Sequence, residues 1–453
     1  MAAAAAFLGV REGDAVPSSV LLELFGRIGP ARNATTATST TSTGHPIAVT
    51  LCGARPPVLS HFSVDFAACP DPDDLSLAPK VVSTDADLVL LRVPVRPHGW
   101  YYQMFSDYFV YRARPRRPTL DLLPKSAPHY FGDNEIAVLS CAGGDGEFAV
   151  AALKRVGMVS FKLHLYRSGP DGEPGSWTSR RADEEQMLRD ATPPSSEMLM
   201  SHLTTKVITL GGAKGTVGWV DLWRGILLCD VLDESPAPVL RDMPLPSPLK
   251  GDWTWCLERC PYYLRDIAVN ERKDAIKYVE VTMLVDDTWK ATTWSMPIPA
   301  TSWSHWRQRC SVWSARVGVP VDVARHYRLL HKLMSGRAHK AAEGVSSLGR
   351  LRMALPTMGV ADEDDDVVYM LAEATSDGAM TTVLAVDLGT QALRGVAKLK
   401  RRRLGFTRGF LVTGVSKHLR ATAEGTGDEF GQTEGQNSNV CDQESERELS
   451  LIN

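Results

Sequence analysis

Short stretches in which apolar and polar residues alternate recur along most of the chain. From Val159 to Leu165 every second residue is apolar, which is the period of a half-buried β-strand. Comparable segments are rich in β-branched and aromatic residues and are bounded by Gly, Pro, Asp and Ser. They predict strands at 47–51, 61–66, 86–93, 108–111, 135–139, 147–153, 159–166, 206–210, 218–222, 226–232, 267–269, 276–282, 290–296, 366–371 and 381–386.

Helical periodicity is sparse by comparison. The best helix candidate is Val321 to Ala341, and Ser19 to Phe25 fits either one helical turn or a strand. The strands arrive in clusters of three or four, often spaced as hairpins, which is typical of a β-propeller. We therefore expect an all-β, β-propeller-like domain of about six blades with a partly helical insertion at 303–348. A pair of β-sandwiches is the alternative.

The two ends of the chain differ in composition from the region between them. Residues 1–18 form an Ala-rich leader without a positively charged start, and no apolar run is long enough to span a membrane. From Ala421 to Asn453 there are eight acidic residues and one basic residue, a net charge of −7. We therefore expect a disordered leader at 1–18, a propeller-like domain at 19–403, and a mostly disordered acidic tail at 404–453.

Composition narrows the class of protein without naming a chemistry. The 453 residues are 44% hydrophobic and 23% charged, with a net charge of −3, so no overall field attracts nucleic acid or a membrane surface. Removing the −7 of the tail leaves 420 residues with a net charge of −3 + 7 = +4. The eight cysteines form no CxxC pair, which favours a reducing, cytoplasmic compartment.

Candidate catalytic and metal-binding motifs do not match known spacings. Gly211 to Thr216 lacks the order of a phosphate loop, so a hairpin loop is predicted. Cys256, Cys260, His305 and Cys310 fit no established zinc pattern. Asp362 to Asp366 lacks the Gly and terminal Glu of a calcium loop. We expect no catalytic residue, metal or cofactor.

The most distinctive segment is Gly218 to Leu232, which reads as a tight hairpin turning at Leu222 to Gly225. One interpretation places Trp219, Asp221, Trp223 and Arg224 on an interaction surface. The other buries Trp219 between sheets and uses Asp221 or Arg224 to satisfy backbone groups. The second is favoured, because aromatic residues at strand spacing usually belong to a core.

A basic cluster near the end of the predicted domain indicates in which compartment of the cell the protein resides. Lys398, Lys400, Arg401, Arg402 and Arg403 fall within six residues, as in a nuclear import signal. No stacking aromatic residues interleave with them, so nucleic-acid binding is not expected. The expected location is the cytoplasm with access to the nucleus.

Several stretches together resemble a plant family, expanded in grasses, that is catalogued as a domain of unknown function (DUF 1618). They are 32–37, 54–57, 86–92, 163–168, 219–232, 367–371 and 385–388. The resemblance extends from about Ser19 to Arg403, and its strand rhythm is similar to that of the propellers appended to plant F-box proteins. It implies a propeller but no catalytic residue or ligand.

Fold and composition together predict a non-enzymatic scaffold for a protein partner. Many exposed loops on a rigid β body suit partner binding. The alternative is an enzyme with a site in a central channel. A ligand-sized channel lined by ionisable groups would favour the enzyme, and a flat apolar patch on one rim would favour the scaffold.

Overall fold

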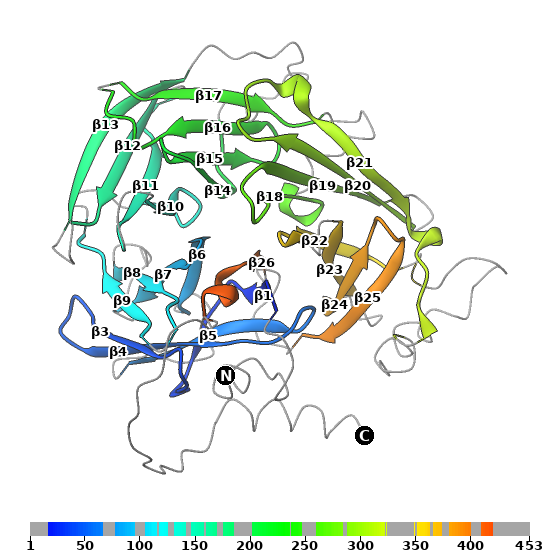
Figure 1. Ribbon diagram of the computed structural model, residues 1–453, viewed down its shortest axis with the longest axis horizontal. Helices are drawn as coiled ribbons and strands as arrows, with labels where there is room; N and C mark the ends of the chain where they lie inside the picture. The colour runs from blue at the N-terminus through cyan, green and yellow to red at the C-terminus, as the bar shows by residue number, and fades with distance from the viewer. Residues whose placement is uncertain are drawn as a thin grey trace, which may run out of the picture.

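Six blades of β-sheet stand in a ring around a central axis in the computed structural model (Figure 1). This arrangement confirms the predicted β-propeller and its six blades. The structure describes residues 17–66, 78–95, 105–115, 117–125, 131–141, 146–157, 160–169, 175–184, 202–235, 237–246, 260–283, 288–321, 323, 348, 351–362, 366–373, 380–399 and 409–419.

Five of the blades are four consecutive antiparallel strands that run from the centre outward. Blade II is β6 (Lys80–Asp85), β7 (Leu88–Pro94), β8 (Ser106–Arg112) and β9 (Thr119–Leu122); blade III is β10 (Ile136–Ser140), β11 (Phe148–Arg155), β12 (Ser160–Arg167) and β13 (Ser176–Glu184); blade IV is β14 (Lys206–Gly211), β15 (Thr216–Asp221), β16 (Gly225–Asp230) and β17 (Val239–Pro244); blade V is β18 (Arg265–Val269), β19 (Ala275–Met283), β20 (Trp289–Pro297) and β21 (Arg307–Trp313); blade VI is β22 (Met353–Met358), β23 (Val367–Glu373), β24 (Met380–Asp387) and β25 (Ala392–Lys398).

Blade I closes the ring by combining the two ends of the domain. Its path is β26 (Phe410–Thr413), β1 (Val20–Glu23), β5 (Leu59–Phe66), β4 (Pro46–Cys52) and β3 (Ala37–Thr40), and β2 (Arg27–Ile28) pairs with β5. Strand β1 lies antiparallel to β26, with Val20 opposite Thr413. The domain predicted at 19–403 therefore stops short of its closing strand, because a four-residue strand just before the acidic tail carries too weak a pattern. The short segment after Ser19 is a strand, not a helical turn.

The hydrophobic core is a set of clusters between neighbouring blades. Successive residues of a strand point to opposite faces of its sheet, so each blade contributes to two clusters. In β15, for example, Trp219 packs toward blade III and Val220 packs toward blade V. This arrangement of radial sheets replaces the predicted alternative, in which two stacked sheets would share one core.

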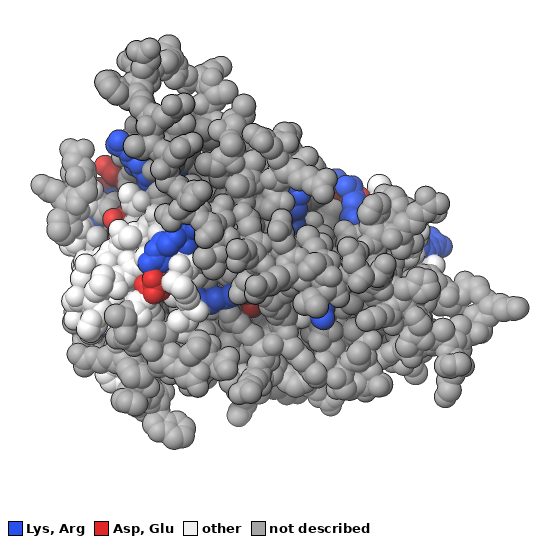
Figure 2. All heavy atoms as spheres, turned by 90° about the horizontal axis from the view of Figure 1, so that it is seen from below, with Lys and Arg blue, Asp and Glu red and all other residues white. Residues whose placement is uncertain are grey.

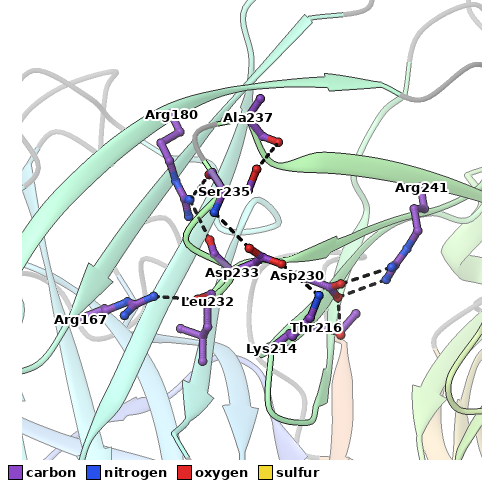
Figure 3. A network of polar contacts seen from close by, with 10 residues as sticks. All are labelled: Arg167, Arg180, Lys214, Thr216, Asp230, Leu232, Asp233, Ser235, Ala237 and Arg241. Carbon is purple, nitrogen blue, oxygen red and sulfur yellow. Dashed lines mark hydrogen bonds and ion pairs between the residues drawn. The ribbon is translucent and has the colours of Figure 1, made fainter.

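Blades III and IV are also joined at their outer edges. Their outermost strands, β13 and β17, pair in parallel at Asp183 and Val239. Arg180 of β13 donates hydrogen bonds to the carbonyl oxygens of Asp233 and Ser235, and Arg167 donates to that of Leu232 (Figure 3). Arg180 also donates to the carbonyl oxygen of Val231. These guanidinium groups satisfy the carbonyls of the turn that follows β16.

The insertion expected at 303–348 is only partly separate from the propeller. Its first described residues form short 3-10 helices at Trp303–His305 and Ser314–Arg316, on either side of β21. Strand β21 belongs to blade V. Most of the helix predicted from Val321 to Ala341 lies outside the described residues. In the part of the chain that the structure describes, no helix is long and apolar enough to cross a membrane.

Candidate functional site

The hairpin between β15 and β16 places its largest side chain inside the protein. Trp219 has an exposed fraction of 0%. Its indole Nε1 donates a hydrogen bond to the carbonyl oxygen of Glu135, 2.8 Å away, on the chain that enters blade III. The ring therefore packs blade III against blade IV and offers no surface to a partner.

The polar side chain of Asp221 in the same hairpin accepts hydrogen bonds from the backbone around it. Asp221 is 2% exposed and accepts hydrogen bonds from the amides of Leu203 (2.8 Å) and Trp223 (2.9 Å). Burial raises the pKa of the Asp221 carboxyl above its usual range, despite these hydrogen bonds and the nearby Arg224. Arg224 is buried as well, and the half-buried Trp223 ring lies 5.5 Å from the Arg265 guanidinium.

The remaining residues singled out from the sequence are spread over the molecule. Lys398 is exposed at the end of β25, whereas Lys400 to Arg403 lie outside the described residues, as does Cys256. Gly211 to Thr216 form the turn between β14 and β15, with Gly211, Gly212 and Gly215 at positive φ. No group of three or more His, Cys, Asp or Glu side chains in the described ranges is placed to hold a metal ion.

A cavity of about 600 Å³ lies around the propeller axis among the described residues, and we call it the central channel. The innermost strands of blades I, II, IV, V and VI line it, together with the segment that leads into blade III. These strands run in the same direction along the axis. We call the end where they begin the amino end and the end where they finish the carboxyl end.

Ion pairs cross the carboxyl end of the channel. The ammonium of Lys273, in the turn after β18 of blade V, lies 2.5 Å from a carboxylate oxygen of Asp85, at the end of β6 in blade II. Blades II and V stand on opposite sides of the ring, so this pair spans it. Lys417, in the 3-10 helix Val415–Leu419, pairs with Glu271 of the same blade V turn.

Local backbone geometry holds the Lys273–Asp85 pair in position. Lys273 has a φ of 55° and Ala86, next to Asp85, has a φ of 51°, both in the left-handed region that non-glycine residues rarely occupy. The Asp85 carboxylate also accepts a hydrogen bond from the Ser140 amide at 2.8 Å. Burial raises the pKa of Asp85, and Lys273 opposes that shift.

Four more ion pairs lie around the amino end. Asp133 contacts both Lys80 and Arg92, each at 3.0 Å. Lys206 of β14 lies 2.6 Å from Asp266 of β18, whose other carboxylate oxygen accepts a hydrogen bond from the Met358 amide. Arg265 pairs with Glu280 at 3.2 Å.

His418 lines the cavity near the carboxyl end and differs from the paired groups. Its Nε2 is buried and has no hydrogen-bond partner among the described residues. Burial lowers the pKa of the imidazole; Lys417 lowers it further, while Asp87, Glu271 and Asp85 act in the opposite direction. At neutral pH the ring is therefore uncharged and keeps one nitrogen available for a hydrogen bond.

Sequence reasoning did not find the channel residues. Asp85 and Lys273 each lie beside a tight turn between two strands, where charged residues are ordinary. The turn that contains Lys273 falls between the predicted strands 267–269 and 276–282, whereas the strand that ends at Asp85, β6, was not predicted. That the two turns meet across an axis depends on the order of the blades around the ring.

The closed ring of six radial sheets defines the class of the protein, a six-bladed β-propeller. Residues 219–369 match the family described as "Protein of unknown function (DUF1618)", which confirms the resemblance to that family over this part of the chain. The matched region begins at Trp219 and extends into blade VI.

Comparison with curated proteins found no match. Among solved structures, a mutant of the Synechocystis apocarotenoid oxygenase is 10% identical, with a TM-score of 0.29, over 85% of this chain and 79% of that chain. The WD40 domain of SCAP from fission yeast is 7% identical, with a TM-score of 0.23, over 83% and 76%. At these TM-scores neither likeness bears on function.

Proposed function

We propose that this chain is a non-enzymatic interaction scaffold that binds an acidic, extended segment of a partner protein along the outer edge of blade V. The proposal rests on the position of β21 at the edge of its sheet and on the side chains along this strand. Strand β21 is the last strand of its sheet in the described residues, so one side of its backbone pairs with β20 and no described strand pairs with the other side. An extended peptide can add to such an edge as a further strand.

The side chains along this edge are those that dominate protein interfaces. Trp303 and Trp313 are 47% and 43% exposed at its two ends, and Arg307, Arg309 and Arg316 are exposed. Trp and Arg are enriched among residues whose truncation weakens binding most. Residues 303–316 contain no Asp or Glu, so their three arginines complement an acidic partner.

The edge is held on a rigid support. The Trp306 indole, just before β21, donates a hydrogen bond to the Pro244 carbonyl oxygen of blade IV at 2.9 Å. At the other end, the Lys290 ammonium lies 5.2 Å from the centre of the Trp313 ring. A different side of the molecule, nearest blade I, shows basic and acidic side chains beside each other on its described part (Figure 2). The absence of acidic residues from 303–316 sets the blade V edge apart from it.

Charge reversal on β21 tests the proposal. The tagged full-length protein and its Arg307→Glu/Arg309→Glu variant are used to capture partners, and the strongest specific partner is purified for direct binding. We expect the double variant to weaken binding at least about tenfold, with an affinity that falls as salt rises. Arg155→Glu, which reverses an exposed arginine on blade III, is the matched control.

Equal binding by the parent and the double variant would overturn the assignment to this edge. The acidic segment 421–453 of the same chain is a competing occupant. If deleting residues 421–453 strengthens partner binding to the parent but not to the double variant, the segment competes for this edge. If the deletion abolishes partner binding to the parent, the partner binds the tail and not the strand.

An enzyme with a site in the channel is the second candidate, and the size of the cavity favours it. The ionisable side chains that line the channel pair mainly with one another, and in the described residues no Ser, Thr or Cys hydroxyl or thiol is hydrogen-bonded to a His that lines the cavity. This pairing favours binding over catalysis.

Nuclear access is proposed from the basic cluster that includes Lys398 and residues 400–403. Replacing Lys400 to Arg403 by Ala in a fusion to several fluorescent proteins should exclude the chain from the nucleus. An unchanged nuclear signal would remove the import role. The fusion is needed because the 49.6 kDa chain alone is small enough to approach passive entry.

A further inference from the structure

The wall of the central channel is apolar between its charged ends. Half-buried side chains from five innermost strands line it, and they leave apolar surface facing the cavity. These residues are Val82, Val207, Val269, Leu355 and Leu411. A volume of about 600 Å³ is within the range of small-molecule pockets, which are mostly apolar and carry a few polar groups. Covering this wall with an apolar ligand removes it from water, which stabilises the bound state.

The amino end carries an excess of positive charge. Lys80, Arg92, Lys206 and Arg265 face Asp133, Asp266 and Glu280, so these four cations meet three carboxylates, and the seven described groups together have a net charge of +1. Asp133 is shared between Lys80 and Arg92, so Lys80 does not have this carboxylate to itself. Lys80 and Lys206 both line the cavity, and each ammonium has further donors for a ligand.

The carboxyl end has no such excess. Asp85, Asp87 and Glu271 are matched by Lys273, Arg112 and Lys417. The Lys273–Asp85 pair also crosses the channel there, so access from this end is obstructed.

We propose that the central channel binds a small organic anion, with one acidic group on an apolar body. The ligand enters at the amino end. Its acidic group lies between Lys80 and Lys206, and its apolar body rests against the wall residues named above. This site is separate from the blade V edge, so each proposal stands or fails without the other.

Two fluorescent probes that differ mainly in an acidic group test the proposal. 8-Anilinonaphthalene-1-sulfonate carries a sulfonate on an apolar aromatic body, and N-phenyl-1-naphthylamine lacks the sulfonate. We expect both to bind the full chain saturably at about one site. Lys80→Gln/Lys206→Gln should weaken sulfonate binding about tenfold, equivalent to about 1.4 kcal/mol, and change binding of the neutral probe less than about twofold.

Lys214→Gln is the matched control, because Lys214 is an exposed lysine paired with Asp233 and does not line the cavity. Asp133→Asn supplies a change of opposite sign. It removes the carboxylate that neutralises Lys80 and Arg92, so it should tighten binding of the sulfonate probe and leave the neutral probe unchanged. It also keeps the proposal testable if the double lysine variant does not fold.

Three results would each overturn the proposal. The parent fails to bind either probe saturably, or the sulfonate probe binds the double variant as tightly as the parent. Alternatively, both probes lose affinity equally in a double variant that melts like the parent, which would mean that the acidic group is not recognised. If Asp133→Asn does not tighten binding of the sulfonate probe, the acidic group of the ligand does not lie between Lys80 and Lys206.

Discussion

The β15–β16 hairpin and the central channel both take polar and charged side chains out of bulk water, but they satisfy them in different ways. In the hairpin, Asp221 accepts hydrogen bonds from two nearby amides and the Trp219 indole donates to a carbonyl of the next blade. In the channel, charged side chains pair with each other and still border open space. Side chains that hydrogen-bond to the backbone stabilise the fold, whereas ion-paired side chains that face a cavity can exchange their partners for a ligand.

Loss of the buried indole should give the largest effect. Trp219→Ala removes a fully buried ring between blades III and IV, and we expect it to lower the free energy of unfolding by about 3–5 kcal/mol. Denaturant titration followed by circular dichroism measures this change. Trp313→Ala, at an exposed tryptophan, should change it by less than about 0.5 kcal/mol. Similar values for the two variants would contradict the structural role of Trp219.

Removal of the hairpin carboxylate should give the next largest effect. Asp221→Ala leaves the amides of Leu203 and Trp223 without their acceptor, at a cost of about 1–3 kcal/mol. Asp221→Asn keeps one acceptor oxygen and should recover part of that loss. Melting temperatures of both variants test the order, and a parent-like melting temperature for Asp221→Ala would instead make this hairpin a candidate recognition site.

Loss of the ion pair across the channel should lower the free energy of unfolding by a smaller amount, because Lys273 is partly solvated. Lys273→Gln leaves the buried Asp85 without its cation, and we expect a loss of about 1 kcal/mol at pH 7. The raised folded-state pKa of Asp85 means that its contribution to stability is present in acid and lost as pH rises through that pKa. Without Lys273 this pKa rises further, so the difference between variant and parent should shrink as pH falls. Unfolding measured from pH 4 to 7 tests this, and a difference that does not change with pH would count against the pair.

The smallest effect concerns His418. Its folded-state pKa is lowered by burial, so its contribution to stability is present above the ordinary histidine range and is lost as pH falls through the folded-state value. His418→Gln should therefore flatten the dependence of unfolding free energy on pH below about 6.5, by less than about 1 kcal/mol. His305→Gln is the control, because His305 lies in the 3-10 helix before β21, away from the channel. Identical pH profiles for the parent and His418→Gln would contradict the expected contribution of His418 to the pH dependence of stability.

Local alternation in the sequence determined the all-β class and fifteen of the strands, but β6 and β21, for example, were not predicted. Strand β12 forms because its apolar residues Phe161, Leu163 and Leu165 recur at the period of a pleated sheet. Four-residue β26 escaped the same reasoning, because so short a strand is defined by its partner β1 and not by its own pattern. The tertiary structure alone decided where the ring closes.

The tertiary structure also decided the channel. Asp85 and Lys273 lie in separate hairpin turns, and nothing in either turn specifies the other. They meet because six radial sheets place the ends of opposite inner strands at one axis. The alternation that defines a strand is a property of neighbouring residues, whereas a pair across the channel depends on the number and register of all the blades between.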